Sequence, residues 1–181
     1  MKHNLYHYFV EGECEEKLIN ELKSINNHSL VAGKVDVLNV INEEIADARL
    51  LALNRNTNII FVYDIDVEKT EILEKNIRKL KYYKFNNVFH IQSIKNLEDE
   101  IVFSSSLKTI NNMFNTSSTS EFKRAFIKQK NISTKLNDIH FDSDKIWSRV
   151  NNIYPFARYS KEKDLEIIKS KIRGNSVLQK C

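Results

Sequence analysis

The feature that most constrains the fold of this chain is the alternation of short β-type and longer helical patterns over its first ~110 residues. Short apolar or β-branched segments predict four strands, at about 5–10, 34–40, 58–63 and 88–91. Amphipathic patterns predict four helices: one that begins at about residue 15, one with apolar residues within 41–52, one over about 68–83, and one over about 97–110. Such alternation is typical of a parallel sheet covered on both faces. We therefore expect an α/β fold with a doubly wound, mostly parallel four-stranded sheet.

The remainder of the chain changes character after a polar segment at 115–120. Short helical patterns follow around Phe122, Ile146 and Leu165, and no further strand is predicted. The chain is therefore expected to divide into two parts, an α/β domain at 1–110 and a helical extension packed on it at 111–181.

Composition adds few limits. The chain has 181 residues, of which 41% are hydrophobic and 29% charged, and a net charge of +4. That is enough for one buried core, and the mild positive charge does not by itself indicate nucleic-acid binding. No apolar stretch approaches the ~20 residues of a membrane span, so no membrane partner is expected. With no signal-peptide pattern and two cysteines that form no motif, the expected location is the cytoplasm.

Two of the predicted strands end abruptly in carboxylates. Glu11 follows the first strand, with Gly12 next and Glu15 four residues on, and Asp64 and Asp66 follow the third strand. In a parallel sheet these ends meet at one edge, and a strand order of 2-1-3-4 makes the first and third strands neighbours. Carboxylates at the ~4.8 Å strand spacing repel each other unless a cation lies between them. Hard oxygen ligands suit Mg²⁺ or Mn²⁺ better than zinc.

A third acidic segment follows the fourth strand, at residues 93–100. Glu98 is the preferred additional site residue, and Lys95 is a candidate for neutralising a phosphate or a leaving group. An acidic first turn that the helix dipole favours explains Glu98 equally well.

Together, the Glu-Gly-x-x-Glu motif at 11–15 and the Asp-x-Asp motif at 64–66 resemble the Toprim domain of topoisomerases, primases and several nucleases. They are most similar to the nuclease branch, which includes the overcoming-lysogenization-defect (OLD) type nucleases and related phage-defence proteins. The resemblance covers about residues 5–107.

This resemblance implies a Mg²⁺-dependent nuclease that cleaves DNA or RNA. It assigns Mg²⁺ binding to Glu11, Asp64 and Asp66, and it assigns to Glu15 the additional carboxylate of two-metal nucleases. The sequence has no Walker A motif, so the ATPase that often accompanies such nucleases, or another defence-system subunit, is expected on a separate chain.

Two alternatives stay open. One is a nucleic-acid-binding or protein-binding module that keeps the fold but performs no chemistry. The other is a phosphoacceptor similar to response regulators, which would need a Lys at the end of a later strand, with Lys95 as a weak candidate.

Aromatic and basic residues of the extension form a candidate substrate surface that would stack on single-stranded bases and contact phosphates. They are Trp147, Tyr154, Phe156, Arg149, Arg158 and Lys128. A small helical core explains Trp147 at least as well.

Overall fold

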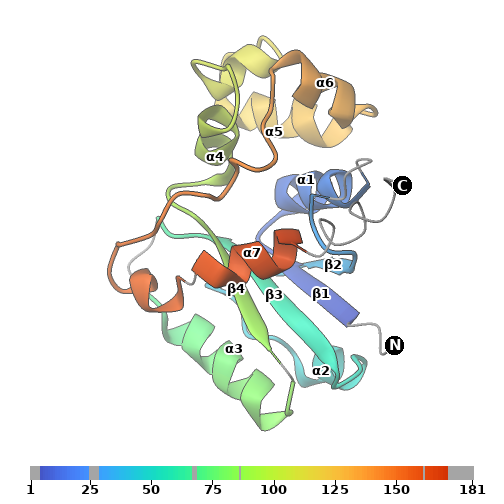
Figure 1. Cartoon of the computed structure of the whole chain (residues 1–181), viewed down its shortest axis with the longest axis vertical. Helices are drawn as coiled ribbons and strands as arrows, with labels where there is room; N and C mark the ends of the chain where they lie inside the picture. Colours follow the sequence, from blue (N-terminus) through green and yellow to red (C-terminus); the bar gives the residue numbers. More distant parts are fainter. Residues whose placement is uncertain (1–4, 25–28, 67–68, 86, 161, 171–181) are drawn as a thin grey trace, which may run out of the picture.

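The computed structural model describes residues 5–24, 29–66, 69–85, 87–160 and 162–170. Its four strands pair in parallel in the order β2-β1-β3-β4 (Figure 1). They are β1 (Leu5–Val10), β2 (Lys34–Val37), β3 (Thr57–Asp64) and β4 (Val88–Ser93). The predicted strand order and the predicted α/β fold class are both confirmed.

Helices cover both faces of the sheet (Figure 1). The described helices are α1 (Glu13–Ser24), α2 (Asp47–Leu51), α3 (Glu71–Tyr82), α4 (Leu97–Phe103), α5 (Thr119–Lys128), α6 (Ile132–Asp138) and α7 (Glu162–Ser170), with 3-10 turns η1 (Ile110–Met113) and η2 (Phe156–Tyr159). Helix α1 packs on one face, α2 and α3 cover the other, and α7 lies against β4.

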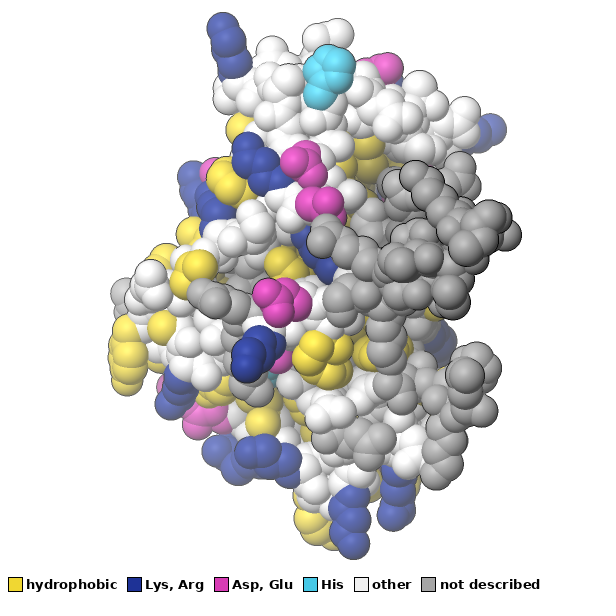
Figure 2. Space-filling model, in the orientation of Figure 1, with side chains coloured by type: hydrophobic (Ala, Val, Ile, Leu, Met, Phe, Trp, Pro, Cys, Tyr) yellow, Lys and Arg dark blue, Asp and Glu magenta, His cyan; other side chains and the backbone are white. Residues whose placement is uncertain are grey.

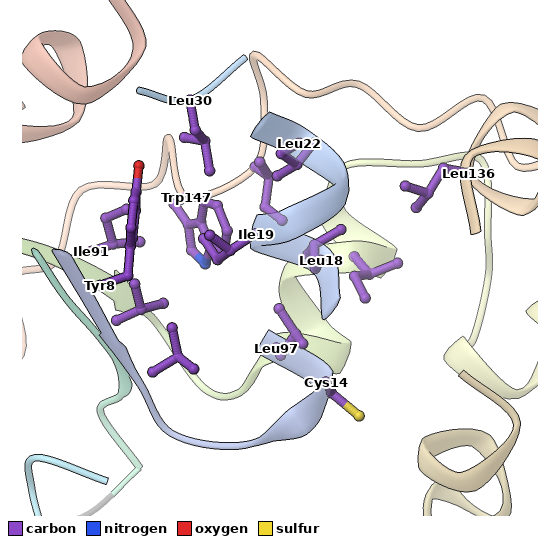
Figure 3. Packing of buried hydrophobic residues seen from close by; sticks show 14 of the residues in the cluster. Tyr8, Cys14, Leu18, Ile19, Leu22, Leu30, Ile91, Leu97, Leu136 and Trp147 are labelled. Atoms are coloured by element: carbon purple, nitrogen blue, oxygen red, sulfur yellow. The ribbon is translucent and has the colours of Figure 1, made fainter. Parts of the chain in front are cut away.

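Alternate residues of the central strands point into two hydrophobic cores, one on each face of the sheet. Tyr8 and Val10 of β1 belong to the core on the α1 face together with Leu18 and Ile19. Figure 3 shows Tyr8 on the side of the sheet that α1 covers. Phe9 and Phe61 instead enter the core on the α3 face. Because β3 is covered on both sides, its segment 57–63 is buried throughout, as its continuous apolar run predicts.

The C-terminal part of the chain shares the first of these cores. Phe122, Phe126, Ile146, Trp147 and Ile168 are all buried in the same cluster as Tyr8 and Leu18. Burying a side chain of this size contributes on the order of 2 kcal/mol. Helix α7 contacts β4 and α5 packs on α1, and one core is continuous across the predicted boundary at residue 110, so the division into two parts stays a prediction.

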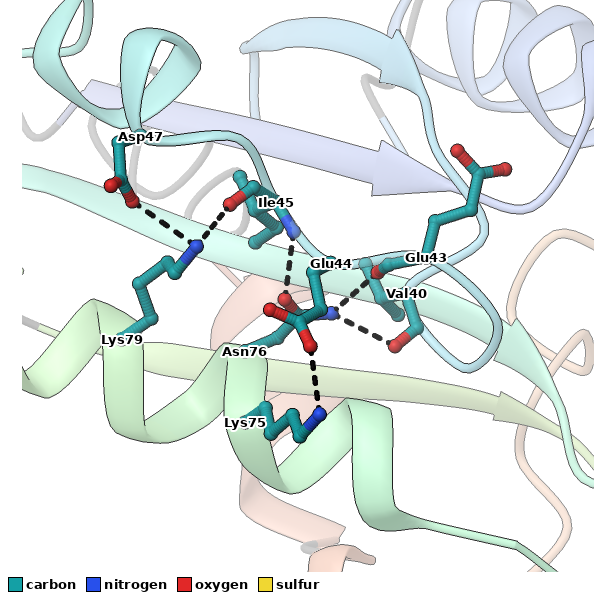
Figure 4. A network of polar contacts seen from close by, with 8 residues as sticks. All are labelled: Val40, Glu43, Glu44, Ile45, Asp47, Lys75, Asn76 and Lys79. Carbon is teal, nitrogen blue, oxygen red and sulfur yellow. Dashed lines mark hydrogen bonds and ion pairs between the residues drawn. The ribbon is translucent and has the colours of Figure 1, made fainter.

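The predicted second helix is wrong over most of its length, since only Asp47–Leu51 is helical. The preceding loop is held by Asn76 of α3, which is fully buried. Its side chain accepts from Ile45 N–H at 2.8 Å and donates to Val40 O at 3.0 Å and Glu43 O at 2.8 Å (Figure 4). These bonds satisfy backbone groups that a helix would satisfy internally, so the amphipathic pattern folds as a loop.

Two other helical predictions are also corrected. Helix α4 ends at Phe103 instead of continuing to 110, because the chain turns and Ser104 O accepts a bond from Asp142 N–H at 2.7 Å. The pattern around Ile146 is not a helix either, since Trp147 has a φ of 56°, outside the right-handed helical region.

The second strand is shorter than expected, ending at Val37 rather than residue 40. Within the described residues, no helix is long and apolar enough to cross a membrane.

Candidate functional site

Glu11 and Asp64 lie side by side at the carboxyl edge of the sheet. Strands β1 and β3 are paired neighbours, with Val10 opposite Val62, and each carboxylate follows or ends its strand. The Asp64 N–H donates to Glu11 Oε2 at 3.1 Å. The prediction that these two residues meet at one edge is confirmed.

Glu15 reaches the same edge from the first turn of α1. Gly12 makes the turn between Glu11 and the helix, and its carbonyl accepts from Glu16 N–H at 3.0 Å. A Cβ added to Gly12 would lie 3.2 Å from Glu15 Oε2, so the small residue leaves room for the Glu15 carboxylate. Glu15 is only 8% exposed, which is unusual for a carboxylate.

Glu98, in the first turn of α4, is 6% exposed and joins the group with a cation beside it. Its Oε1 lies 3.2 Å from Lys123 Nζ of α5. Helix α5 is tied to α1, because Lys17 Nζ donates to Ile127 O at 2.6 Å and to Gln129 O at 2.5 Å. The carboxylates of Glu11, Glu15, Asp64, Asp66 and Glu98 are called the acidic edge from here on.

Burial first, and mutual repulsion second, raise the pKa of three carboxylates of the acidic edge, those of Asp64, Glu11 and Glu15. Burial raises the pKa of Asp64 to about 8, and the Glu11 and Glu15 charges add to the rise. Burial also raises the pKa of Glu11, with a partly offsetting effect of the Asp64 N–H and a reinforcing one of Asp66. The pKa of Glu15 is raised by burial and then by Glu11 and Glu98. Without a cation, these groups are therefore reluctant to ionise together.

Lys123 is the nearby cation that opposes this repulsion. It lowers the pKa of Glu11 and of Glu15, although burial and the other carboxylates outweigh it. Burial lowers the pKa of Lys123 itself, but Glu98 and Glu15 outweigh that effect, so its pKa is raised. One ammonium thus faces several carboxylates.

The donor atoms of the acidic edge fit a hard divalent cation. Asp64 Oδ1 is buried without a hydrogen-bond partner, Glu98 Oε1 pairs with the Lys123 ammonium at 3.2 Å, and the neighbouring Ser93 hydroxyl is close enough to Asp64 to offset part of the rise in its pKa. Carboxylate oxygens in this state are the ligands that Mg²⁺ prefers. No group of three or more His, Cys, Asp or Glu side chains in the described parts of the chain is already gathered as a metal site. Convergence of three carboxylates on one ion stays a prediction.

The other predicted site residues lie farther from this arrangement. Asp66 is exposed, yet close enough to raise the pKa of Glu11. Lys95 is exposed in the loop after β4, and the cation acting on the carboxylates is Lys123. The roles assigned to Lys95, including the one that the phosphoacceptor alternative needs, stay predictions.

Four of the six residues of the candidate substrate surface in the extension are either buried or paired with carboxylates of the protein. Trp147 and Phe156 are buried in the two cores, so their predicted stacking on bases is wrong. Arg149 pairs with Asp99 and Glu100, and Arg158 pairs with Glu74. Of the six predicted residues, Tyr154 and Lys128 are exposed and take part in none of these contacts. The described side chains on the face in Figure 2 do not form one continuous basic patch.

Sequence reasoning missed Lys123 and Ser93 as members of the site. Ser93 ends β4 and pairs in register with Asp64, so the strand order alone places it at the edge. Lys123 has no such signal, because it is one of several basic residues on a helix whose docking on α1 no local pattern reveals.

Comparison of the chain with protein-family models, with curated proteins and with solved structures found no match. The resemblance to Toprim nucleases therefore rests on the two motifs and on the strand order.

Proposed function

We propose that this protein is a Mg²⁺-dependent nuclease that hydrolyses phosphodiester bonds of DNA or RNA at the acidic edge. The observation that carries the proposal is the contact between Asp64 N–H and Glu11 Oε2, which sets two strand-end carboxylates side by side. The motifs at 11–15 and 64–66 support the same assignment through their resemblance to Toprim nucleases.

Glu11, Glu15, Asp64 and Asp66 would hold one or two Mg²⁺ or Mn²⁺ ions, with Glu98 beside them. Bound there, the cations supply positive charge to a phosphate and make water a better nucleophile. The carboxylates themselves would position the cations, and the raised pKa values of Glu11, Glu15 and Asp64, caused by burial and then by mutual repulsion, support this role because a cation would favour their ionised forms.

Lys123 has a separate role in this proposal. Glu98 holds its ammonium next to the carboxylates, so the charge is fixed at the edge before substrate arrives. An ammonium placed there stabilises the negative charge that develops on a leaving oxygen, the role that the sequence assigns to Lys95.

The resemblance extends the proposal to phage defence in the cytoplasm, together with a separate ATPase or another defence-system subunit.

Cleavage assays test the proposal directly. The full chain is incubated with single- and double-stranded DNA and RNA in Mg²⁺, in Mn²⁺ and in EDTA. We expect cleavage that needs the divalent cation and disappears in Glu11→Gln and Asp64→Asn. Lys123→Gln should reduce the rate about tenfold or more. Asp47→Asn, an exposed Asp paired with Lys79 on the α3 face, is the matched control and should cleave normally.

Cleavage that persists in EDTA, or in Asp64→Asn, would contradict the proposal. Tight nucleic-acid binding with no cleavage under any cation would favour the non-catalytic binding module instead.

A further inference from the structure

Exposed apolar side chains concentrate on one short segment before η2. Of the nine large apolar side chains exposed in the described residues, three lie within 150–154. Val150 is 55% exposed, Ile153 47% and Tyr154 87%. Apolar side chains grouped in this way commonly mark a contact surface, whereas single ones do not.

This segment is fastened beside the acidic edge. Asn151 Nδ2 donates to Gln92 Oε1 at 2.7 Å, and Gln92 Nε2 donates to Phe156 O at 3.2 Å. Gln92 precedes Ser93, which pairs in register with Asp64. Tyr154 therefore lies on a loop held at both sides by the carboxyl end of β4, where Figure 1 shows the chain passing from α6 to η2.

The loop that carries Tyr154 and the helix that carries Lys123 belong to opposite faces of the sheet. Phe156, two residues after Tyr154, is buried with Phe61 and Leu73 on the α3 face. Lys123 comes from α5, which packs on α1 on the other face. A polymer crossing the carboxyl edge would thus have Lys123 towards one face of the sheet and the loop that carries Tyr154 towards the other.

We infer that Tyr154 stacks on a base of a single-stranded nucleic acid laid across the acidic edge. This inference rests on the proposed function. Every base has an aromatic face, so one exposed ring holds a strand without reading its sequence. The segment itself carries no basic residue, and the two arginines that flank it, Arg149 and Arg158, pair with Asp99, Glu100 and Glu74, so its contribution to binding is aromatic and apolar.

The test measures oligonucleotide binding in a variant that is not expected to cleave, so that affinity is measured without loss of the substrate. Fluorescence anisotropy of labelled single-stranded DNA and RNA oligonucleotides is measured on the full chain carrying Asp64→Asn, with and without a change at Tyr154. Tyr154→Ala should weaken binding about fivefold or more, whereas Tyr154→Phe should keep the parent affinity. Tyr82→Ala is the matched control, because Tyr82 is 81% exposed but ends α3 at the opposite edge of the sheet.

Unchanged affinity in Tyr154→Ala overturns the inference, and so does an equal loss in Tyr154→Phe, which would point to the hydroxyl. Self-association that Tyr154→Ala abolishes, with oligonucleotide affinity intact, would assign the segment to a second copy of the chain and also overturn it. Failure of the proposed function has a different signature, which is the absence of cation-dependent cleavage by the parent chain.

Discussion

Two glutamates in the first turn of α4, Glu98 and Glu100, belong to regions that bury carboxylates in opposite ways. Glu100 is fully buried, and its Oε1 accepts from Ile94 N–H at 3.1 Å and pairs with Arg149 at 2.5 Å. Its Oε2 accepts from Trp147 N–H at 3.2 Å. These four residues form the Glu100 network, in which both carboxylate oxygens have partners and the charge is compensated.

The acidic edge, two residues away along the helix, lacks this compensation. Asp64 Oδ1 is buried without a hydrogen-bond partner, Glu98 Oε1 has the half-exposed Lys123 ammonium at 3.2 Å, and this one cation lies among several carboxylates. A buried carboxylate whose oxygens are all paired can link distant parts of a fold. A buried carboxylate that lacks such pairing lowers the stability of the fold, and a cation that binds to it restores that stability. The comparison distinguishes Glu100, a carboxylate that stabilises the fold, from the carboxylates of the acidic edge, which we propose bind a cation.

The largest effect is expected from breaking the Glu100 network. Glu100→Ala leaves the Arg149 charge short of a partner and leaves the buried Trp147 N–H and the half-buried Ile94 N–H without an acceptor. We expect a loss of about 3 kcal/mol in the free energy of unfolding, measured by urea denaturation. Glu98→Gln, on the same helix, should change it by less than about 1 kcal/mol.

Equal losses in the two variants would erase the distinction between the regions. An unchanged free energy of unfolding in Glu100→Ala would show that the Arg149 charge does not depend on Glu100 for its compensation.

A smaller effect is expected from the pH dependence of the cation-free protein. The folded pKa of Asp64, about 8, lies above its ordinary value of 3.8, so the folded state binds the proton more tightly. Stability is therefore greatest below about pH 4 as far as this group is concerned, and it falls as pH rises towards 8. Glu11 and Glu15, whose pKa values are also raised, act in the same direction.

Asp64→Asn removes the largest part of this slope. Above pH 8 without divalent cation, the variant should be more stable than the parent, by on the order of 1 kcal/mol. Thermal unfolding in EDTA across this pH range measures the difference. A parent and variant with parallel pH profiles would show that Asp64 ionises freely.

The sequence was sufficient to predict those residues of the acidic edge whose position is set by where a strand ends. Glu11 and Asp64 directly follow or end strands, so parallel pairing and the strand order suffice to bring them together. The difference between Glu98 and Glu100 was not predictable, because both fit an acidic first turn. It depends on Arg149, which is 49 residues beyond Glu100, and on Lys123, neither of which any local pattern assigns to α4.

The same limit explains the helix wrongly predicted before β3. The amphipathic spacing of 41–52 is compatible with a helix, and the loop forms because Asn76, 31 residues after Ile45, binds its backbone. Propensity and periodicity are local, whereas a buried side chain that satisfies distant backbone groups is a tertiary effect.

The most direct test of the central claim is a Mg²⁺ titration followed by thermal unfolding. A cation that binds only the folded state raises Tm with increasing concentration, and here it also relieves the repulsion at the acidic edge. We predict this rise for the parent chain and for Asp47→Asn, and no rise for Glu11→Gln or Asp64→Asn. A rise of the same size in all four proteins would place the cation elsewhere and contradict the account.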